Sequence, residues 1–342
     1  MTSVVASPWT IDGRAFPAGA DLRIQLRFAV RYAILAPSSH NTQPWLFRIG
    51  DARVELVCDR TRALPVVDPD DRELLISCGA ALFVLRLTLH AHGLAERTTI
   101  LPDPTDGDLL ARVDVIGNAS PQTQDVRLFE EIQSRVTSRA LFEPDPVPEH
   151  VVSAMRSAAM DEGAWLAPFA GADERAAVGS LVARGDIDQF ADERFRRELA
   201  LWMHARRSGD GLAVHGALVT RTLMRTFDIG GRRARSDREI AEGSPLLAVL
   251  GTGGDSPRTW IAAGQALAHV LLLAQRAGLA SGFLNQPIEV PELRPQLAAL
   301  TKHEGLPQLL VRFGYPKAGL GAPPRHTARR PLIDVLLKAD AP

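Results

Sequence analysis

The sequence predicts an α+β protein built from two related units in one chain. Two apolar, leucine-rich runs, residues 79–95 and 264–280, align without a gap, and both end in Gly-Leu-Ala. That glycine suits the position just after a helix C-terminus. Residues 111–117 and 308–314 follow them with the composition of strands, each after a proline-bearing link. The shared order favours an internal duplication over a chance similarity of two helices.

Length and composition predict a globular protein with a large core. The chain has 342 residues, of which 46% are hydrophobic and 23% charged, with a net charge of −1. Such a balance argues against broad binding to nucleic acids or anionic membranes, which needs a clear basic excess. The N-terminus lacks the pattern of a signal peptide, and no uninterrupted apolar run approaches the roughly 20 residues of a membrane span. We therefore expect a cytoplasmic protein.

Cysteine and histidine spacing gives no sign of a metal site. The two cysteines, Cys58 and Cys78, form no CxxC pair. Reduced, buried thiols are the simpler interpretation, and a bridge between them stays open. The nine histidines show no ligand spacing typical of a metal site. We therefore predict no metal.

A polar turn at residues 36–45 is the most informative stretch of the chain. It reads Ala-Pro-Ser-Ser-His-Asn-Thr-Gln-Pro-Trp and lies between a predicted helix, residues 26–35, and a predicted strand, residues 46–49. Proline disfavours helix at the residue before it, so the helix should stop near Ala36. Short hydroxyl and amide groups beside an indole suit a flat heterocycle that needs several hydrogen bonds. A plain helix stop followed by a polar loop would fit the same composition.

The turn closely resembles the flavin-contacting signature of the nitroreductase family, the FMN-dependent NAD(P)H oxidoreductases. The matching residues are Pro37, Ser38, Ser39, Asn41, Gln43 and Trp45. The resemblance implies that the serines and the asparagine hold the ribityl chain and ring edge of FMN, while the glutamine and the tryptophan support the turn.

The repeated helix and strand resemble the C-terminal part of a nitroreductase subunit, and these enzymes are normally homodimers with FMN at the interface. The chain is similar to such a dimer fused into one polypeptide, as in the actinobacterial Acg-like branch. The implied fold is an intramolecular pseudo-dimer of mixed, largely antiparallel sheets flanked by helices. We assign residues 1–122 to the first unit and 123–342 to the second, intertwined in one compact body. Residues 190–240 are an insertion, interpreted as a lid. Its basic stretch, residues 230–238, is interpreted as a mobile loop that acts as the lid, with a plain solvated loop as the alternative.

The second unit carries a segment that resembles the family's phosphate-binding arginines. It contains Arg135, Thr137, Ser138 and Arg139, but Val136-Thr137 stand where Arg-Ser is common, so one cation is missing. Two guanidinium groups four residues apart can face one phosphate, although a solvated basic helix start is an alternative. The first unit lacks this segment and the second lacks the turn. We therefore predict one FMN per chain.

Two further segments complete the predicted FMN site by resemblance. The C-terminal arginines match the family's basic end, whose cation reaches the same phosphate; they are Arg325, Arg329 and Arg330. A charged tail on a solvated surface is the alternative for each. Backbone N–H groups of Leu284, Asn285 and Gln286 would approach the flavin ring.

The resemblance implies an oxidoreductase that passes a hydride from NADPH or NADH through FMN to a small aromatic or quinone-type electron acceptor. The flavin carries the chemistry, so no side chain is predicted to be catalytic. An FMN storage or sequestration protein with little turnover is the alternative. The sequence favours an enzyme over this storage protein. We expect a monomer, because the dimer is fused, with a higher oligomer as the alternative. No nucleic-acid or membrane partner is expected.

Overall fold

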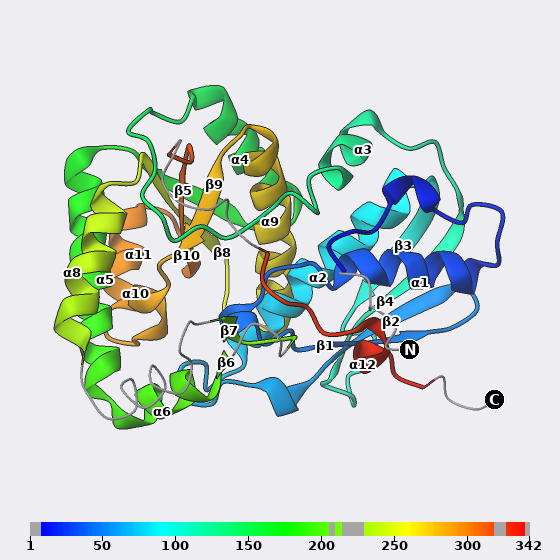
Figure 1. The fold of residues 1–342 in the computed structure, drawn as a ribbon, viewed down its shortest axis with the longest axis horizontal. Helices are drawn as coiled ribbons and strands as arrows, with labels where there is room; N and C mark the ends of the chain where they lie inside the picture. The colour runs from blue at the N-terminus through cyan, green and yellow to red at the C-terminus, as the bar shows by residue number, and fades with distance from the viewer. Residues whose placement is uncertain (1–7, 205–208, 214–228, 318–325, 339–342) are drawn as a thin grey trace, which may run out of the picture.

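The computed structural model describes residues 8–204, 209–213, 229–317 and 326–338 (Figure 1). It contains two four-stranded antiparallel sheets. The first has the order β1-β2-β4-β3, with β1 (Trp45–Ile49), β2 (Arg53–Cys58), β3 (Leu94–Ile100) and β4 (Leu109–Asn118). The second has the order β5-β8-β10-β9, with β5 (Trp165–Phe169), β8 (Leu246–Thr252), β9 (Ala280–Phe283) and β10 (Leu306–Gly314). Both sheets thus share one topology, which confirms the predicted α+β fold of two fused units.

Helices cover both sheets and fill the space between them. Around the first sheet lie α1 (Leu22–Ala33), α2 (Arg72–Ala91), α3 (Thr123–Phe129) and the short C-terminal α12 (Leu332–Val335). Around the second lie α4 (Glu149–Asp161), α5 (Ala172–Ala191), α6 (Glu193–Leu201), α8 (Gly230–Glu242), α9 (Pro257–Arg276), α10 (Gln286–Glu289) and α11 (Arg294–Thr301). A two-stranded parallel pair, β6 (Met203–His204) and β7 (Leu212–Ala213), follows α6.

The second sheet is buried on both faces because helices cover each of them. Along β8, Leu246, Ala248 and Leu250 pack into one apolar cluster. The alternate residues Leu247 and Val249 pack into another, on the opposite face. Successive side chains of a strand point to opposite faces, so an uninterrupted apolar strand is what a doubly covered sheet requires.

The two long helices α2 and α9 pack against each other at the centre of the molecule (Figure 1). They begin at Arg72 and Pro257, a full two turns before the glycines that open the aligned runs. The aligned runs therefore begin inside the helices, with Gly79 and Gly264 at the crossing. The glycines after the helices, Gly93 and Gly278, both have φ of +77°, as predicted for a helix C-terminus.

Among the described residues, α2 is the one helix long and apolar enough to cross a membrane by length and composition. Because 83% of its most apolar window is buried inside the protein, α2 serves as a core helix. Cys78, on this helix, and Cys58 of β2 are both buried and free.

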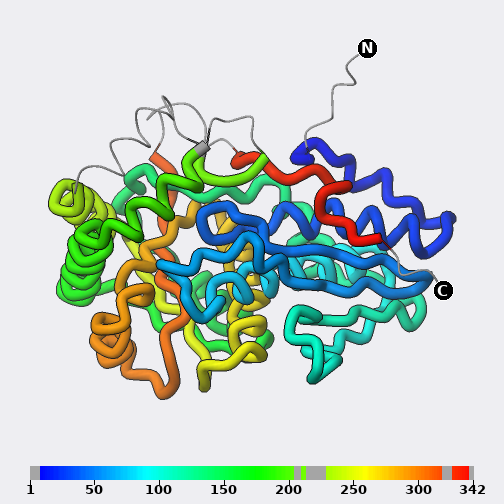
Figure 2. The backbone as a smooth tube through the Cα atoms, turned by 90° about the horizontal axis from the view of Figure 1, so that it is seen from below, coloured from blue at the N-terminus to red at the C-terminus, as the bar shows by residue number. Residues whose placement is uncertain are grey.

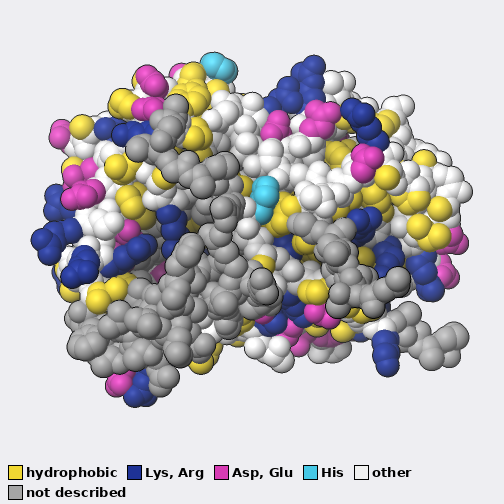
Figure 3. All heavy atoms as spheres, in the orientation of Figure 1, with side chains coloured by type: hydrophobic (Ala, Val, Ile, Leu, Met, Phe, Trp, Pro, Cys, Tyr) yellow, Lys and Arg dark blue, Asp and Glu magenta, His cyan; other side chains and the backbone are white. Residues whose placement is uncertain are grey.

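The basic stretch 230–238 is part of helix α8 and not a mobile loop, so that interpretation was wrong. Arg233 pairs with Asp237 and Arg238 with Glu242, each at helical spacing. Buried Ala234 lies on the same helix, which packs along α5. Figure 3 shows basic and acidic side chains side by side at this edge. These pairs and the tertiary packing offset the low helix propensity of the glycines at the start of α8. Residues 214–228 of the insertion 190–240 lie outside the described residues, and its role as a lid stays a prediction.

Candidate functional site

The turn at residues 36–45 has a strained backbone. Three of its non-glycine residues have positive φ angles: His40 at +48°, Asn41 at +55° and Gln43 at +53°. Each such conformation costs on the order of 1 kcal/mol and persists only where the surroundings hold it. Strain of this kind concentrates at functional sites, so the turn is a candidate on backbone geometry alone.

Side chains inside the turn and from distant segments hold it in place. Ser38 Oγ accepts from Gln43 N at 3.0 Å. Asn41 Nδ2 donates to Gly211 O at 3.2 Å, and Gln43 Nε2 donates to Gly209 O at 2.9 Å. Both amide side chains are buried. Asn41, predicted to contact the cofactor, therefore also braces the turn, as Gln43 does.

The C-terminal arginines Arg329 and Arg330 reach back to this turn. Arg329 donates to Asn41 Oδ1 at 3.0 Å and to the backbone oxygens of Leu35 and Ala36 at 3.0 and 3.1 Å. Arg330 donates through its backbone N–H to Gln43 Oε1 at 2.8 Å. Figure 2 shows the C-terminal segment, in red, lying along the first unit. Arg325 lies outside the described residues.

Four residues of the turn are only half-buried: Pro37, Ser38, Ser39 and His40. Ser39 Oγ donates to Glu73 Oε2 at 2.5 Å. Burial lowers the pKa of His40 to about 4; the negative charge of Glu73 opposes this shift, and the positive charge of Arg139 adds to it. His40 is therefore neutral at physiological pH. Trp45, by contrast, is fully buried at the start of β1 and belongs to the core.

Arg135 is a buried cation near Arg329. Its side chain donates to Thr137 Oγ1 at 3.5 Å, and it forms no ion pair with any carboxylate of the described residues. Burial lowers its pKa to about 10. The pKa of Arg329 is also lowered, first by burial and then by the charge of Arg135. Two buried guanidinium groups thus lie near each other. Arg329 is held by its hydrogen bonds to the turn, whereas Arg135 bears most of the cost of burying an unpaired charge.

Trp9 connects Gln133, two residues before the arginine segment at 135–139, with His326 and Arg329 of the C-terminal segment. Gln133 Nε2 donates to Trp9 O at 3.1 Å. The Trp9 ring stacks on His326 at 4.1 Å and lies under the Arg329 guanidinium at 4.7 Å. Together with the Arg329–Asn41 bond, these contacts bring parts of the first unit, the second unit and the C-terminus close to Arg329.

The rest of the arginine segment lies along β9 of the second sheet. Ser138 N donates to Ser281 O at 2.7 Å, and Thr137 forms a parallel bridge with Ser281. Arg312 of β10 holds the same segment by donating to Ser138 O at 2.7 Å. Arg139 is exposed, in contrast to Arg135, so the two predicted guanidinium groups have different surroundings.

The predicted segment Leu284–Gln286 follows β9 and is firmly held. Leu284 N donates to Leu310 O at 3.0 Å, and Asn285 Oδ1 accepts from Leu310 N at 3.0 Å. Gln286 Nε2 donates to two buried carboxyl groups, Asp186 at 3.2 Å and Asp237 at 3.0 Å. Burial raises the pKa of Asp186 to about 7, and the charge of Asp237 acts in the same direction.

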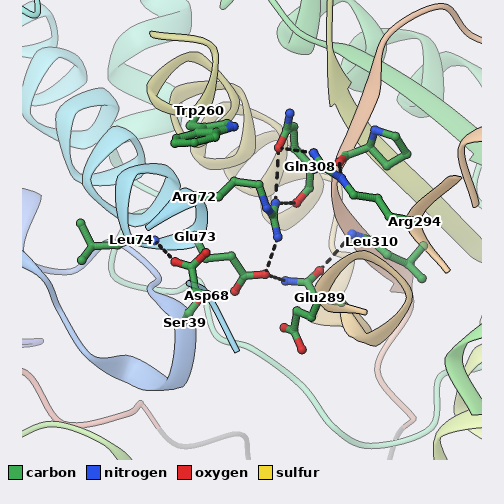
Figure 4. Close-up of polar contacts among 12 residues, drawn as sticks. Ser39, Asp68, Arg72, Glu73, Leu74, Trp260, Glu289, Arg294, Gln308 and Leu310 are labelled. Atoms are coloured by element: carbon green, nitrogen blue, oxygen red, sulfur yellow. Dashed lines mark hydrogen bonds and ion pairs between the residues drawn. The ribbon is translucent and has the colours of Figure 1, made fainter. Parts of the chain in front are cut away.

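Sequence reasoning missed Glu73, which joins two of these segments (Figure 4). Its carboxylate is 2% exposed, pairs with Arg72 at 3.0 Å, and accepts from both Ser39 and Asn285. A signal existed in the chain, because Arg72 and Glu73 open a long apolar helix where charged residues must be buried. Periodicity alone could not tell that helix start from a solvated one.

The arrangement suits an elongated ligand with an anionic end. Buried, unpaired guanidinium groups can bind a phosphate, while half-buried hydroxyls can bind neutral polar groups of a ring. In the described part of the chain, no group of three or more His, Cys, Asp or Glu side chains could hold a metal ion.

Comparison with known families agrees with this description. The model described as "Nitroreductase family" matches residues 132–315, which is more than half of the chain. The chain therefore belongs to the nitroreductase family, as the sequence predicted.

Two relatives from Mycobacterium tuberculosis cover nearly the whole chain. "Putative NAD(P)H nitroreductase Rv3131" is 32% identical over 94% of this chain and 92% of its own length. "Putative NAD(P)H nitroreductase acg" is 31% identical over 91% of this chain and 94% of its own length. These matches confirm the predicted Acg-like resemblance. Among solved structures, FMN-dependent NfnB from Mycobacterium smegmatis in complex with NADPH is 20% identical, covering 56% of this chain and 89% of its own, with a TM-score of 0.35.

Proposed function

We propose that this protein is an FMN-binding oxidoreductase that holds one FMN per chain. It uses NADPH or NADH to reduce small aromatic or quinone-type acceptors by two electrons. Family membership and the NAD(P)H nitroreductase names of relatives that span the chain support this class of activity.

The observation that carries the proposal is the buried Arg135 guanidinium, which no carboxylate of the described residues neutralises. A buried charge without a partner costs several kcal/mol, so the residue fits a site completed by an anion. The phosphate of FMN is such an anion. Arg329, whose pKa is lowered by burial and by the charge of Arg135, donates to Asn41 of the turn, so a ring bound at the half-buried serines could follow a phosphate bound at Arg135.

Each segment would hold one part of the cofactor. Arg135, with Thr137, Ser138 and Arg139, would bind the phosphate, and Arg329 would support it. Pro37, Ser38 and Ser39 would contact the ribityl chain and ring, next to the backbone of Asn285. Bound FMN supplies hydride chemistry at its N5 atom, whereas the chain positions the ring and excludes water.

One experiment tests cofactor and activity together. The purified protein should be yellow, with one FMN per chain by absorbance and protein assay, and anaerobic NADPH or NADH should bleach it. A yellow protein that neither nucleotide bleaches would favour the storage alternative. Colourless protein that cannot be loaded with FMN would contradict both functions, and two FMN per chain would contradict the single site.

We also propose that the two units meet at residues 122–123. The strands of the first sheet end at Asn118 and those of the second begin at Trp165, with Gln122 immediately before α3. Because each unit already packs against the other through α2 and α9, the protein should be a monomer. Its mass by light scattering would test this state.

A further inference from the structure

The Glu73 carboxylate connects two segments that the proposed function places around FMN. Its Oε2 atom accepts a hydrogen bond from the hydroxyl of Ser39, in the turn of the first unit, with 2.5 Å between the two oxygens. Its Oε1 atom accepts from Asn285 Nδ2 at 3.4 Å, from the segment after β9 of the second unit (Figure 4). Glu73 is 2% exposed, so water competes weakly for these bonds.

Strand β10 holds the carboxylate in this orientation through two intermediaries. Arg72 pairs with Glu73 Oε1 at 3.0 Å, and its other terminal nitrogen donates to Gln308 O at 2.5 Å. Asn285 is held by Leu310 N, which donates to its Oδ1 at 3.0 Å. With Arg72 and Asn285 both anchored on β10, the Glu73 carboxylate has little freedom to turn away from Ser39.

This contact decides what Ser39 can offer to a ligand. A serine hydroxyl has one proton to donate and two lone pairs that accept. The proton of Ser39 is committed to Glu73. Ser39 is half-buried, and it lies in the part of the turn that remains open. Toward a bound molecule, its oxygen can therefore act as an acceptor.

We propose that Glu73 is a positioning residue that makes the Ser39 hydroxyl a dedicated acceptor for a hydrogen-bond donor of FMN. This inference rests on the proposed function. The donors that FMN carries are the ring N3–H and the ribityl hydroxyls. Glu73 itself acts through Ser39 and need not touch the cofactor.

A double-mutant cycle on FMN affinity tests the coupling. The Kd of the apoprotein is measured by quenching of FMN fluorescence for the wild type, Ser39→Ala, Glu73→Gln and the double variant. Each single change should weaken binding roughly threefold to tenfold, as expected for one hydrogen bond. The double variant should bind no more weakly than the weaker single variant. Additive losses, or unchanged affinity in both single variants, would overturn the proposal.

Two further variants separate positioning from loss of folding. Thr88→Val removes a buried hydroxyl of the same helix, bonded to Val84 O and remote from the turn, and should leave FMN affinity unchanged. If Glu73→Gln does not fold, because Arg72 loses its partner, Glu73→Asp keeps the charge while withdrawing the carboxylate from Ser39. The cycle is then measured with Glu73→Asp in place of Glu73→Gln. Additive losses from Glu73→Asp and Ser39→Ala would also overturn the proposal.

An FMN analogue methylated at N3 identifies the donor. If Ser39 accepts from the ring, the analogue binds the wild type more weakly, and Ser39→Ala weakens it no further. If Ser39 accepts from the ribityl chain, Ser39→Ala weakens FMN and the analogue by the same factor. A wild type that binds no FMN would instead overturn the proposed function and this inference with it, whereas uncoupled losses in an FMN-binding protein overturn the inference alone.

Discussion

Gly79 of α2 and Gly264 of α9 face each other where the two core helices cross. A Cβ atom on Gly264 would lie 2.8 Å from Gly79 Cα and 2.0 Å from Ile76 O. A Cβ atom on Gly79 would lie 2.2 Å from Ile261 O. The two glycines occupy equivalent positions in the repeated runs of the sequence. Each unit thus presents the same surface to the other, as in a two-fold dimer interface.

Gly264→Ala is expected to lower the free energy of unfolding by about 3 kcal/mol or more. The added methyl meets backbone atoms of α2, which cannot rotate away as a flexible side chain would. Urea unfolding followed by circular dichroism measures the loss. Gly231→Ala in α8 is the matched control, because a Cβ there meets nothing within 4 Å. The control should be neutral or stabilising by up to about 1 kcal/mol. Equal tolerance at both positions would contradict the close crossing.

Arg135→Ala is expected to weaken FMN binding by roughly 10-fold to 100-fold, the range of a charge-assisted hydrogen bond. Riboflavin, which lacks the phosphate, should bind the variant and the wild type equally well. The apoprotein should be no less stable, because a buried unpaired charge is removed. Titration with both flavins checks this, with exposed Arg127→Ala as control. If Arg135→Ala weakens the binding of FMN and riboflavin by the same factor, Arg135 does not bind the phosphate.

Asp186→Asn is expected to stabilise the protein more at pH 8 than at pH 5. Burial, helped by the charge of Asp237, raises the pKa of Asp186 from 3.8 to about 7. The folded state keeps this proton where the unfolded chain has lost it, so the free energy of unfolding falls as pH rises from about 4 to about 7. Asparagine cannot ionise, and the gain should grow by on the order of 2 kcal/mol between the two pH values. Urea unfolding of both proteins at pH 5 and pH 8 measures this difference. A gain in stability that is the same at both pH values would contradict the raised pKa of Asp186.

His269→Phe is expected to show the opposite pH dependence. His269 is 7% exposed, stacks on Phe83 at 4.9 Å, and neither ring nitrogen has a hydrogen-bond partner. Burial lowers its pKa below 6.5, although Glu162 opposes this. The unfolded chain therefore binds a proton first, and stability is lost as pH falls below about 6.5. The gain from phenylalanine should be larger at pH 5 than at pH 8. Thermal melts at both pH values test the sign.

Much of the fold was predictable because it depends on local patterns. The helix predicted at residues 26–35 is observed as α1, and the strand predicted at residues 46–49 is observed as β1. These elements, and the glycines that follow α2 and α9, depend on periodicity and backbone preference. The repeat predicted two units, and the two sheets have the same strand order. Helix α8 was missed because its glycines and arginines favour a loop until Asp237, Glu242 and α5 are in place.

The candidate site was only partly predictable. The turn, the arginine segment and the C-terminal arginines were found by their resemblance to one family, and the structure brings Asn41 and Arg329 into contact. Glu73 had no such motif. Its place between Ser39 and Asn285 depends on residues far apart in the chain.

By itself, the sequence determined the class of protein, the duplication and the residue types around the turn, because these reside in short patterns. The tertiary structure alone decided which charges are buried and which partner each polar atom has. Arg135 and Arg139 look alike in the sequence, yet one is buried and the other exposed. The free energy of a charge depends on its distance from water and from other charges, and only the folded chain sets those distances.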